Sequence, residues 1–147
     1  SMTVAVTSMA SSFDICASGL TAQRKKMDVI VSNLANASTI QTPEGGPYKR
    51  KVAVLAAEPA NGKFGAALND ALSQVKVQEV IEDAEGLKKV HDPTHPNADE
   101  QGFVTYPNVN VVTEMADMIT ANRAYEACVT AMDASKNMVL KALDIGK

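Results

Sequence analysis

Large side chains are scarce in this chain. It has no tryptophan, and aromatic residues make up only 4% of its 147 residues, although 46% are apolar. Alanine and valine, with 22 and 16 residues, supply more than half of the apolar total. The bulkier core-forming residues barely exceed the level below which disorder is expected. We therefore expect long, thin, alanine-rich packing surfaces instead of a single thick core.

Proline is missing from both ends of the chain. All six prolines lie between Pro43 and Pro107, whereas all seven methionines lie outside this segment. Proline breaks a helix because it lacks a backbone donor, whereas methionine is compatible with one. The composition predicts three parts: an N-terminal helix in residues 1–42, a small β-rich domain with loops in residues 43–108, and a C-terminal helix in residues 109–147.

Two further absences exclude whole classes of protein. The three parts carry formal charges of +1, −3 and −1, and none is basic enough for a nucleic-acid partner. No apolar run approaches the roughly 18 residues of a membrane-spanning helix. The first 13 residues carry no charge and no long apolar stretch, so we expect no cleaved secretory signal peptide.

Cysteine is almost absent as well. The chain has two, Cys16 and Cys128, one in each predicted helix, which is too few for a disulfide framework. Two small buried thiols are the favoured interpretation. If the two helices pair side by side, a bridge between them is also geometrically possible.

Apolar residues in the N-terminal part recur at alternating intervals of four and three. This heptad spacing predicts a helix over residues 11–36 with one narrow apolar stripe. Ser11, Ser12 or Asp14 lies where an N-cap is expected, and Pro43 lies beyond the predicted end. The stripe consists of Met9, Phe13, Cys16, Leu20, Gln23, Met27, Ile30, Leu34 and Ala37.

The C-terminal part repeats this spacing. Asn110 is a plausible N-cap, Glu114 lies in the first turn, where the helix dipole favours a carboxylate, and Gly146 is placed to end the helix. Neither narrow stripe can be buried by its own helix, so each needs a helical partner. The second stripe consists of Val111, Met115, Met118, Asn122, Tyr125, Val129, Met132, Lys136, Val139 and Leu143.

The middle of the chain favours short strands. Alternating and β-branched residues predict them at residues 52–55, 75–81, 86–90 and 102–106, with Pro- and Gly-rich turns between them. Residues 61–73 are rich in Gly and Ala and predict a flexible loop. The expected fold class is α+β: two long terminal helices packing as a coiled coil, with a small antiparallel β unit inserted between them.

Three stretches of the sequence resemble a known family. Residues 17–36, which end in Ser-Asn-Leu-Ala-Asn, resemble the N-terminal motif shared by the axial proteins of the bacterial flagellum, the rod and hook subunits. Residues 102–127, with Asn-Arg-Ala-Tyr-Glu-Ala at 122–127, are similar to the C-terminal helix of that family. Residues 42–51 carry a longer Pro-Glu-Gly-Gly-Pro form of a Gly-Tyr-Lys/Arg segment. This form, together with residues 92–96, resembles one rod member.

Two positions depart from the family pattern. Ser38 stands where Asn is common, and Cys128 is unusual for its place. Neither departure removes a residue with a chemical role. The family-motif residues carried over to this sequence are Asn33, Asn36, Pro43, Gly45, Gly46, Pro47, Tyr48 and Arg123.

The resemblance implies a structural subunit of the flagellar proximal rod, with no catalysis, no cofactor and no small-molecule substrate. It implies export through the flagellar type III apparatus without a cleaved signal peptide, and helical assembly in the periplasm that transmits torque. The implied partners are other copies of the chain, other rod proteins and, in transit, the export apparatus. The predicted assembly interface is formed by Phe13, Leu20, Met27, Ile30, Leu34, Val111, Met115, Met118, Tyr125, Val129 and Met132.

Two other functions stay open at this point. His91, Asp92 and His95, with Asp99 and Glu100 nearby, form the one cluster with metal-ligand chemistry and would suit a small metal-dependent enzyme. The neighbouring prolines argue for a loop instead. A type III-exported adhesin or effector is the second alternative. The Lys49–Lys51 run beside Tyr48 is interpreted as a solvated strand edge protected by charge.

Overall fold

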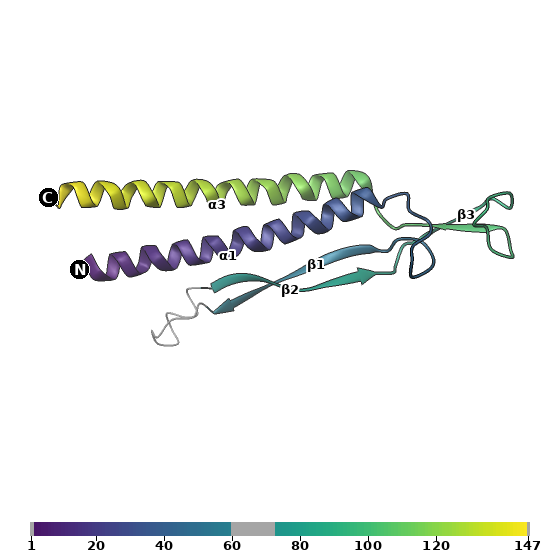
Figure 1. The fold of residues 1–147 in the computed structure, drawn as a ribbon, viewed down its shortest axis with the longest axis horizontal. Coiled ribbons are helices and arrows are strands. Elements are labelled where there is room, and N and C mark those ends of the chain that lie inside the picture. Colours follow the sequence, from purple (N-terminus) through teal and green to yellow (C-terminus); the bar gives the residue numbers. More distant parts are fainter. Residues whose placement is uncertain (1, 60–72, 147) are drawn as a thin grey trace. The chain divides into compact units, whose positions relative to one another are not determined.

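The computed structural model describes the backbone of residues 2–59 and 73–146, and the side chains of residues 3, 4, 13–57 and 76–146. In chain order, two long helices precede and follow the strands (Figure 1), which confirms the α+β prediction. The predicted loop at residues 61–73 lies outside the described residues except for its last member. The elements are α1 (Met2–Ala35), β1 (Arg50–Pro59), β2 (Ser73–Asp83), β3 (Lys88–His91), β4 (Phe103–Tyr106) and α3 (Val111–Ile145).

Helix α1 begins nine residues earlier than predicted. It runs from Met2 through Ser11, Ser12 and Asp14 without interruption, so the prediction of an N-cap at these residues is wrong. No Gly or Pro occurs before Gly19, and the Val and Thr residues of the first turns each lower helix propensity by only a few tenths of a kcal/mol. The sequence therefore contains nothing that stops the helix from extending to its first residues.

Helix α3 begins and ends as its capping residues predict. The Asn110 side-chain Oδ1 accepts a hydrogen bond from the Thr113 N–H at 3.1 Å, and the Asn110 carbonyl accepts the first helical bond, from the Glu114 N–H, at 2.9 Å. The helix ends at Ile145, and Gly146 follows it. The N-cap and the C-terminal stop are both confirmed.

The strands pair as two separate two-stranded sheets. β1 pairs with β2, and β3 pairs with β4 in an antiparallel register that sets Lys88 opposite Tyr106 and His91 opposite Phe103. All four predicted strands are present, and β1 and β2 extend beyond their predicted ends. The inserted region is thus two small ribbons, and neither is large enough to enclose a core of its own.

The chain divides into two compact units, and each long helix contributes to both. The first unit contains residues 1–25, 55–78 and 120–147, and the second contains residues 26–54 and 79–119. Most of the buried apolar side chains belong to the second unit, namely Val29, Ile30, Tyr48 and Val104. Neither helix, as far as its residues are described, has an apolar stretch long enough to cross a lipid bilayer.

Candidate functional site

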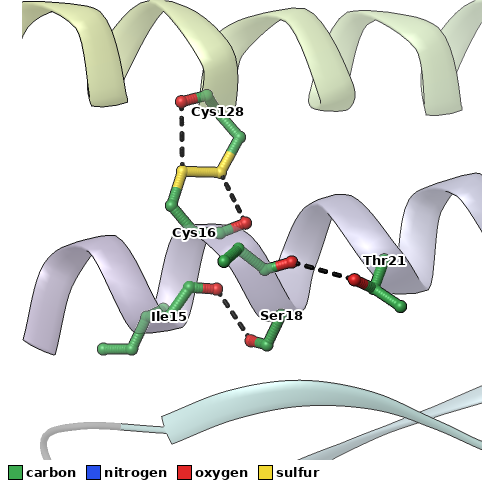
Figure 2. Close-up of a disulfide and its surroundings, with 6 residues drawn as sticks. Ile15, Cys16, Ser18, Thr21 and Cys128 are labelled. Carbon is green, nitrogen blue, oxygen red and sulfur yellow. Dashed lines mark hydrogen bonds between the residues drawn. A yellow bond between two sulfur atoms is a disulfide. The ribbon is translucent and has the colours of Figure 1, made fainter.

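Helices α1 and α3 are joined in the first unit by a disulfide between Cys16 and Cys128 (Figure 2). The two Cα atoms lie 5.6 Å apart, although 112 residues separate the cysteines in the sequence. This corrects the favoured interpretation of two free thiols and realises the alternative of a bridge. Such a bridge requires the two helices to lie side by side with these residues facing each other, and the heptad spacing does not fix which residues face each other.

The stripe of α1 predicted from the heptad spacing is covered within the chain. Phe13, Leu20, Met27 and Leu34 are half-buried, and Ile30 is only 4% exposed. The described members of this stripe therefore pack inside the subunit.

The covered side of α3 is offset from the predicted one. Met118, Tyr125 and Met132 are half-buried, whereas Val111 and Met115 are 45% and 55% exposed. Val129 is also exposed. Along the covered side, these half-buried residues alternate with residues that are small or polar. A search for apolar residues alone therefore assigns the exposed Val111, Met115 and Val129 to the covered side in their place. The covered positions are Glu114, Asp117, Met118, Ala121, Tyr125, Cys128, Met132, Ser135 and Val139.

A buried polar network in the second unit is centred on Asn33 of α1. Its Nδ2 donates to the Lys51 carbonyl at 2.9 Å and to Glu114 Oε2 at 3.3 Å. Its Oδ1 accepts from the Lys51 N–H at 2.9 Å and from the Tyr48 hydroxyl at 2.8 Å. Both donors and both acceptor sites of the amide are thus used. Asn33 is 1% exposed, and this residue fixes α1 against β1 and α3.

Two glycines shape the loop that delivers Tyr48 to this network. Gly45 and Gly46 have φ angles of +93° and +75°, a left-handed conformation that costs other residues about 1 kcal/mol or more. The turn is closed by the Thr42 N–H, which donates to the Gly46 carbonyl at 2.9 Å, and the Tyr48 N–H donates to the Thr39 carbonyl at 2.9 Å. The family-motif glycines therefore act through the backbone.

The remaining family-motif residues have smaller roles. Asn36 Nδ2 donates to the Ser32 carbonyl at 2.8 Å, one turn back along α1. Pro47 is half-buried in the loop, whereas Pro43 and Arg123 are exposed.

Arg50, Asn108 and Glu114 also belong to the network, and the sequence analysis does not predict them as site residues. Arg50 Nε pairs with Glu114, which is 1% exposed, and the Arg50 N–H donates to Asn108 Oδ1 at 2.8 Å. The prediction of a solvated strand edge is therefore incomplete for Arg50, because its side chain also pairs with the buried Glu114. The sequence contained one signal for this network, the position of Glu114. It lies four residues before Met118 and seven before Ala121, which places an acidic side chain on the covered side of α3. Its partner could not be found from spacing.

The His-containing loop shows no metal-site geometry. The ring of His91 packs edge-on against Phe103, with centroids 5.0 Å apart, and His95 Nδ1 accepts a hydrogen bond from the Asn97 N–H at 3.0 Å. Within the described part of the chain, no three His, Cys, Asp or Glu side chains come together in a way that could hold a metal ion. The metal-dependent enzyme and the adhesin or effector gain no support.

Comparison with known families defines the class of protein. Residues 13–40 match the family model described as flagella basal body rod protein. Residues 100–145 match the model described as flagellar basal body rod FlgEFG protein C-terminal. The two matches contain α1 from Phe13, the β4 strand and all of α3. Both cysteines of the disulfide, and Asn33 and Glu114 of the polar network, lie within these matched segments.

Relatives over nearly the whole length make the assignment specific. The flagellar basal-body rod protein FlgC of Bacillus subtilis is 43% identical, and the match covers 92% of this chain and 97% of the relative. FlgC of Borreliella burgdorferi is 43% identical over 92% and 95%, and FlgC of Salmonella typhimurium is 41% identical over 92% and 96%. The chain belongs to the FlgC family of flagellar basal-body rod proteins. It is therefore a structural subunit of the flagellar basal-body rod.

Proposed function

We propose that the chain assembles helically with copies of itself and with other rod proteins in the proximal rod, through the exposed apolar side of α3, and that it transmits torque without any catalytic step. The observation that supports this is the offset between the covered and the exposed stripes of α3. Residues such as Val111 and Met115 are apolar, regularly spaced and uncovered in the single chain.

The exposed stripe continues along α3. At about 100° per residue, Val111, Met115, Val129 and Leu140 project to one side of the helix. This side is adjacent to the one that packs on α1. A helix with a second apolar side favours packing against a further helix. Phe13, Leu20, Met27, Ile30 and Leu34 then hold the helix pair together within the subunit, together with Met118, Tyr125 and Met132.

The test uses substitutions that leave the single chain folded. Met115→Asp and Val129→Asp place a charge on the exposed stripe, and Ala131→Asp places the same charge on the opposite, exposed side of α3. We expect the first two to abolish swimming and rod assembly in a strain without its own copy. Ala131→Asp should support both, because it lies away from the stripe. All three purified proteins should unfold within about 1 kcal/mol of the parent, since the sites are exposed.

Two results would overturn the proposed interface. Normal rods built from Met115→Asp and Val129→Asp subunits would remove the stripe from the assembly. Equal failure of all three variants would show a general intolerance of charge on α3. Ile30→Asp is a poorer probe, because Ile30 is 4% exposed and the variant loses the subunit's own packing.

Export through the flagellar type III apparatus into the periplasm, with no segment removed, is part of the proposal. It is supported by the family to which the chain belongs and not by where this sequence begins. Mass measurement of the subunit in purified basal bodies, compared with the translated polypeptide, tests it. A shortened N-terminus in the rod would contradict it.

A further inference from the structure

Among the residues whose side chains are described, the disulfide lies in the unit with fewer buried apolar side chains. Among the described residues of this unit, Ala22 and Ala121 are the buried apolar side chains, and both are small. The Gln23 Oε1 atom is buried there without a hydrogen-bond partner. Such an unsatisfied acceptor lowers the free energy of unfolding. The described side chains that pack around Cys16 and Cys128 are therefore small or only half-buried.

The second unit has a different basis for its stability. Val29, Ile30 and Val104 are buried there, and the fully hydrogen-bonded Asn33 links its elements. None of these contacts uses a cysteine. The covalent link thus reinforces the unit whose described residues include fewer buried apolar side chains.

The same site accommodates the reduced pair. Cys16 Sγ lies 3.1 Å from the Cys128 carbonyl oxygen, and Cys128 Sγ lies 3.0 Å from the Cys16 carbonyl oxygen (Figure 2). In the dithiol form each S–H has an acceptor in place. The Cα separation of 5.6 Å lies in the usual range for a disulfide. The helix backbones are thus already spaced for the bond, and on reduction the two Sγ atoms move apart beside these carbonyl acceptors.

We propose that Cys16 and Cys128 form a redox clasp that fastens α1 to α3 within the first unit and is closed only under oxidising conditions. The oxidant is a small-molecule or protein disulfide. One cysteine thiolate attacks it, forms a mixed disulfide and releases one thiol. The second cysteine thiolate then attacks the mixed disulfide, forms the Cys16–Cys128 bond and releases the second thiol. Two cysteine thiols are oxidised, their two protons end on the two released thiols, and one disulfide of the oxidant is reduced.

The clasp restricts opening of the first unit because it closes a loop of more than a hundred residues. A crosslink removes more entropy from the opened chain when the loop that it closes is longer. Reduction should therefore increase local opening in the first unit and leave the second unit unchanged. Opening of this kind is measured residue by residue by amide hydrogen exchange.

The experiment compares the full chain with and without a reductant by hydrogen-exchange mass spectrometry. After reduction, peptides within residues 13–25 and 120–132 should exchange at least about tenfold faster. Peptides within residues 26–54 and 103–119 should exchange at the same rate. The double variant Cys16→Ser/Cys128→Ser is the matched control. It should exchange like the reduced parent and should not respond to the reductant.

Several outcomes would overturn the clasp. Alkylation of two cysteines in the air-oxidised chain, or a disulfide-linked dimer on a non-reducing gel, would exclude the intrachain bond. Unchanged exchange on reduction would show that the bond does not restrict opening of the first unit. An equal rise in exchange in both units would show that the effect of the bond is not confined to the first unit. If the double variant does not fold, the reduced parent gives the same comparison. The clasp does not depend on rod assembly, so either proposal can fail while the other stands.

Discussion

The side chain of Asn33 binds the main chain of Lys51 as a neighbouring β-strand would. Its amide donates to the Lys51 carbonyl and accepts from the Lys51 N–H, both at 2.9 Å. A residue of α1 thereby takes the place of a strand partner at the start of β1. One side chain thus sets the position of the strand against the helix.

Asn33→Asp should destabilise the chain by about 3 kcal/mol, because it removes two buried donors and places a carboxylate beside Glu114. The same substitution at Asn122, which is exposed on α3, is the matched control and should change the free energy of unfolding by less than about 0.5 kcal/mol. Urea denaturation measures both. A loss at residue 33 no larger than that of the control would contradict the central role of Asn33.

Arg50 and Glu114 should be energetically coupled. Arg50→Met leaves the buried Glu114 carboxylate with Asn33 as its remaining side-chain donor among the described contacts. We expect a loss of about 2 kcal/mol, below the value for a fully buried pair because the Arg50 side chain is 28% exposed.

A double-mutant cycle completes this test. Arg50→Met/Glu114→Met should cost clearly less than the two single substitutions together, because it removes both charges at once. Lys49→Met, at the exposed neighbouring residue, should be nearly silent. Additive losses would mean that the two side chains do not interact.

Gly102 should not tolerate a side chain. Its φ is +83°, and an added Cβ would lie 3.1 Å from Pro93 Cγ and 3.2 Å from His91 Nε2. Gly102→Ala should therefore cost about 2 to 3 kcal/mol, combining backbone strain with displacement of the loop. Gly86 has a similar φ of +80°, but an added Cβ there would make only an ordinary van der Waals contact, with Asn108 Cβ at 3.9 Å. Gly86→Ala should therefore cost only about 1 kcal/mol. Equal thermal shifts would refute the steric argument.

The loop before β4 should weaken in acid through Asp99. Its carboxylate accepts hydrogen bonds from the Phe103 and Gln101 N–H groups, each at 2.9 Å. These bonds, that from Phe103 first, hold the pKa of Asp99 below its ordinary value of 3.8. A lowered folded-state pKa means that the stabilisation is complete above 3.8 and is lost as the pH falls through the folded-state pKa.

Comparison with Asp99→Asn isolates this contribution. Loop protection in the parent, followed by amide exchange of Phe103, should exceed that of the variant at pH 6. The two should converge as the pH falls below 3.8, the ordinary pKa. A constant difference across this pH range would remove Asp99 ionisation as the cause.

Local chemistry was readable for much of the fold. The Asn110 cap, the stop at Gly146, the proline-rich middle and the four strands all follow from residues close together in the sequence. The early start of α1 was missed because a continuous helix needs no signal to continue. The covered side of α3 was placed incorrectly because apolarity marks two adjacent sides of this helix, and only one of them packs on α1.

The candidate sites depended on contacts between distant residues. Asn33 and Tyr48 were identified through the family motif, but their joint role depends on Glu114, which lies 81 residues beyond Asn33. The disulfide joins cysteines 112 residues apart. Spacing rules describe one element at a time, and they carry no information about which elements meet.

Residue types and their spacing are enough to specify a chain of helix, strands and helix, because proline, glycine and capping residues act on their own backbone neighbours. The composition also determined that the core would be thin, because bulky residues are few. Long-range packing settles which side of α3 stays exposed, which charges are buried together and whether the two thiols meet. These depend on the packing of α1 against α3 and β1, which brings distant groups within reach of short-range forces.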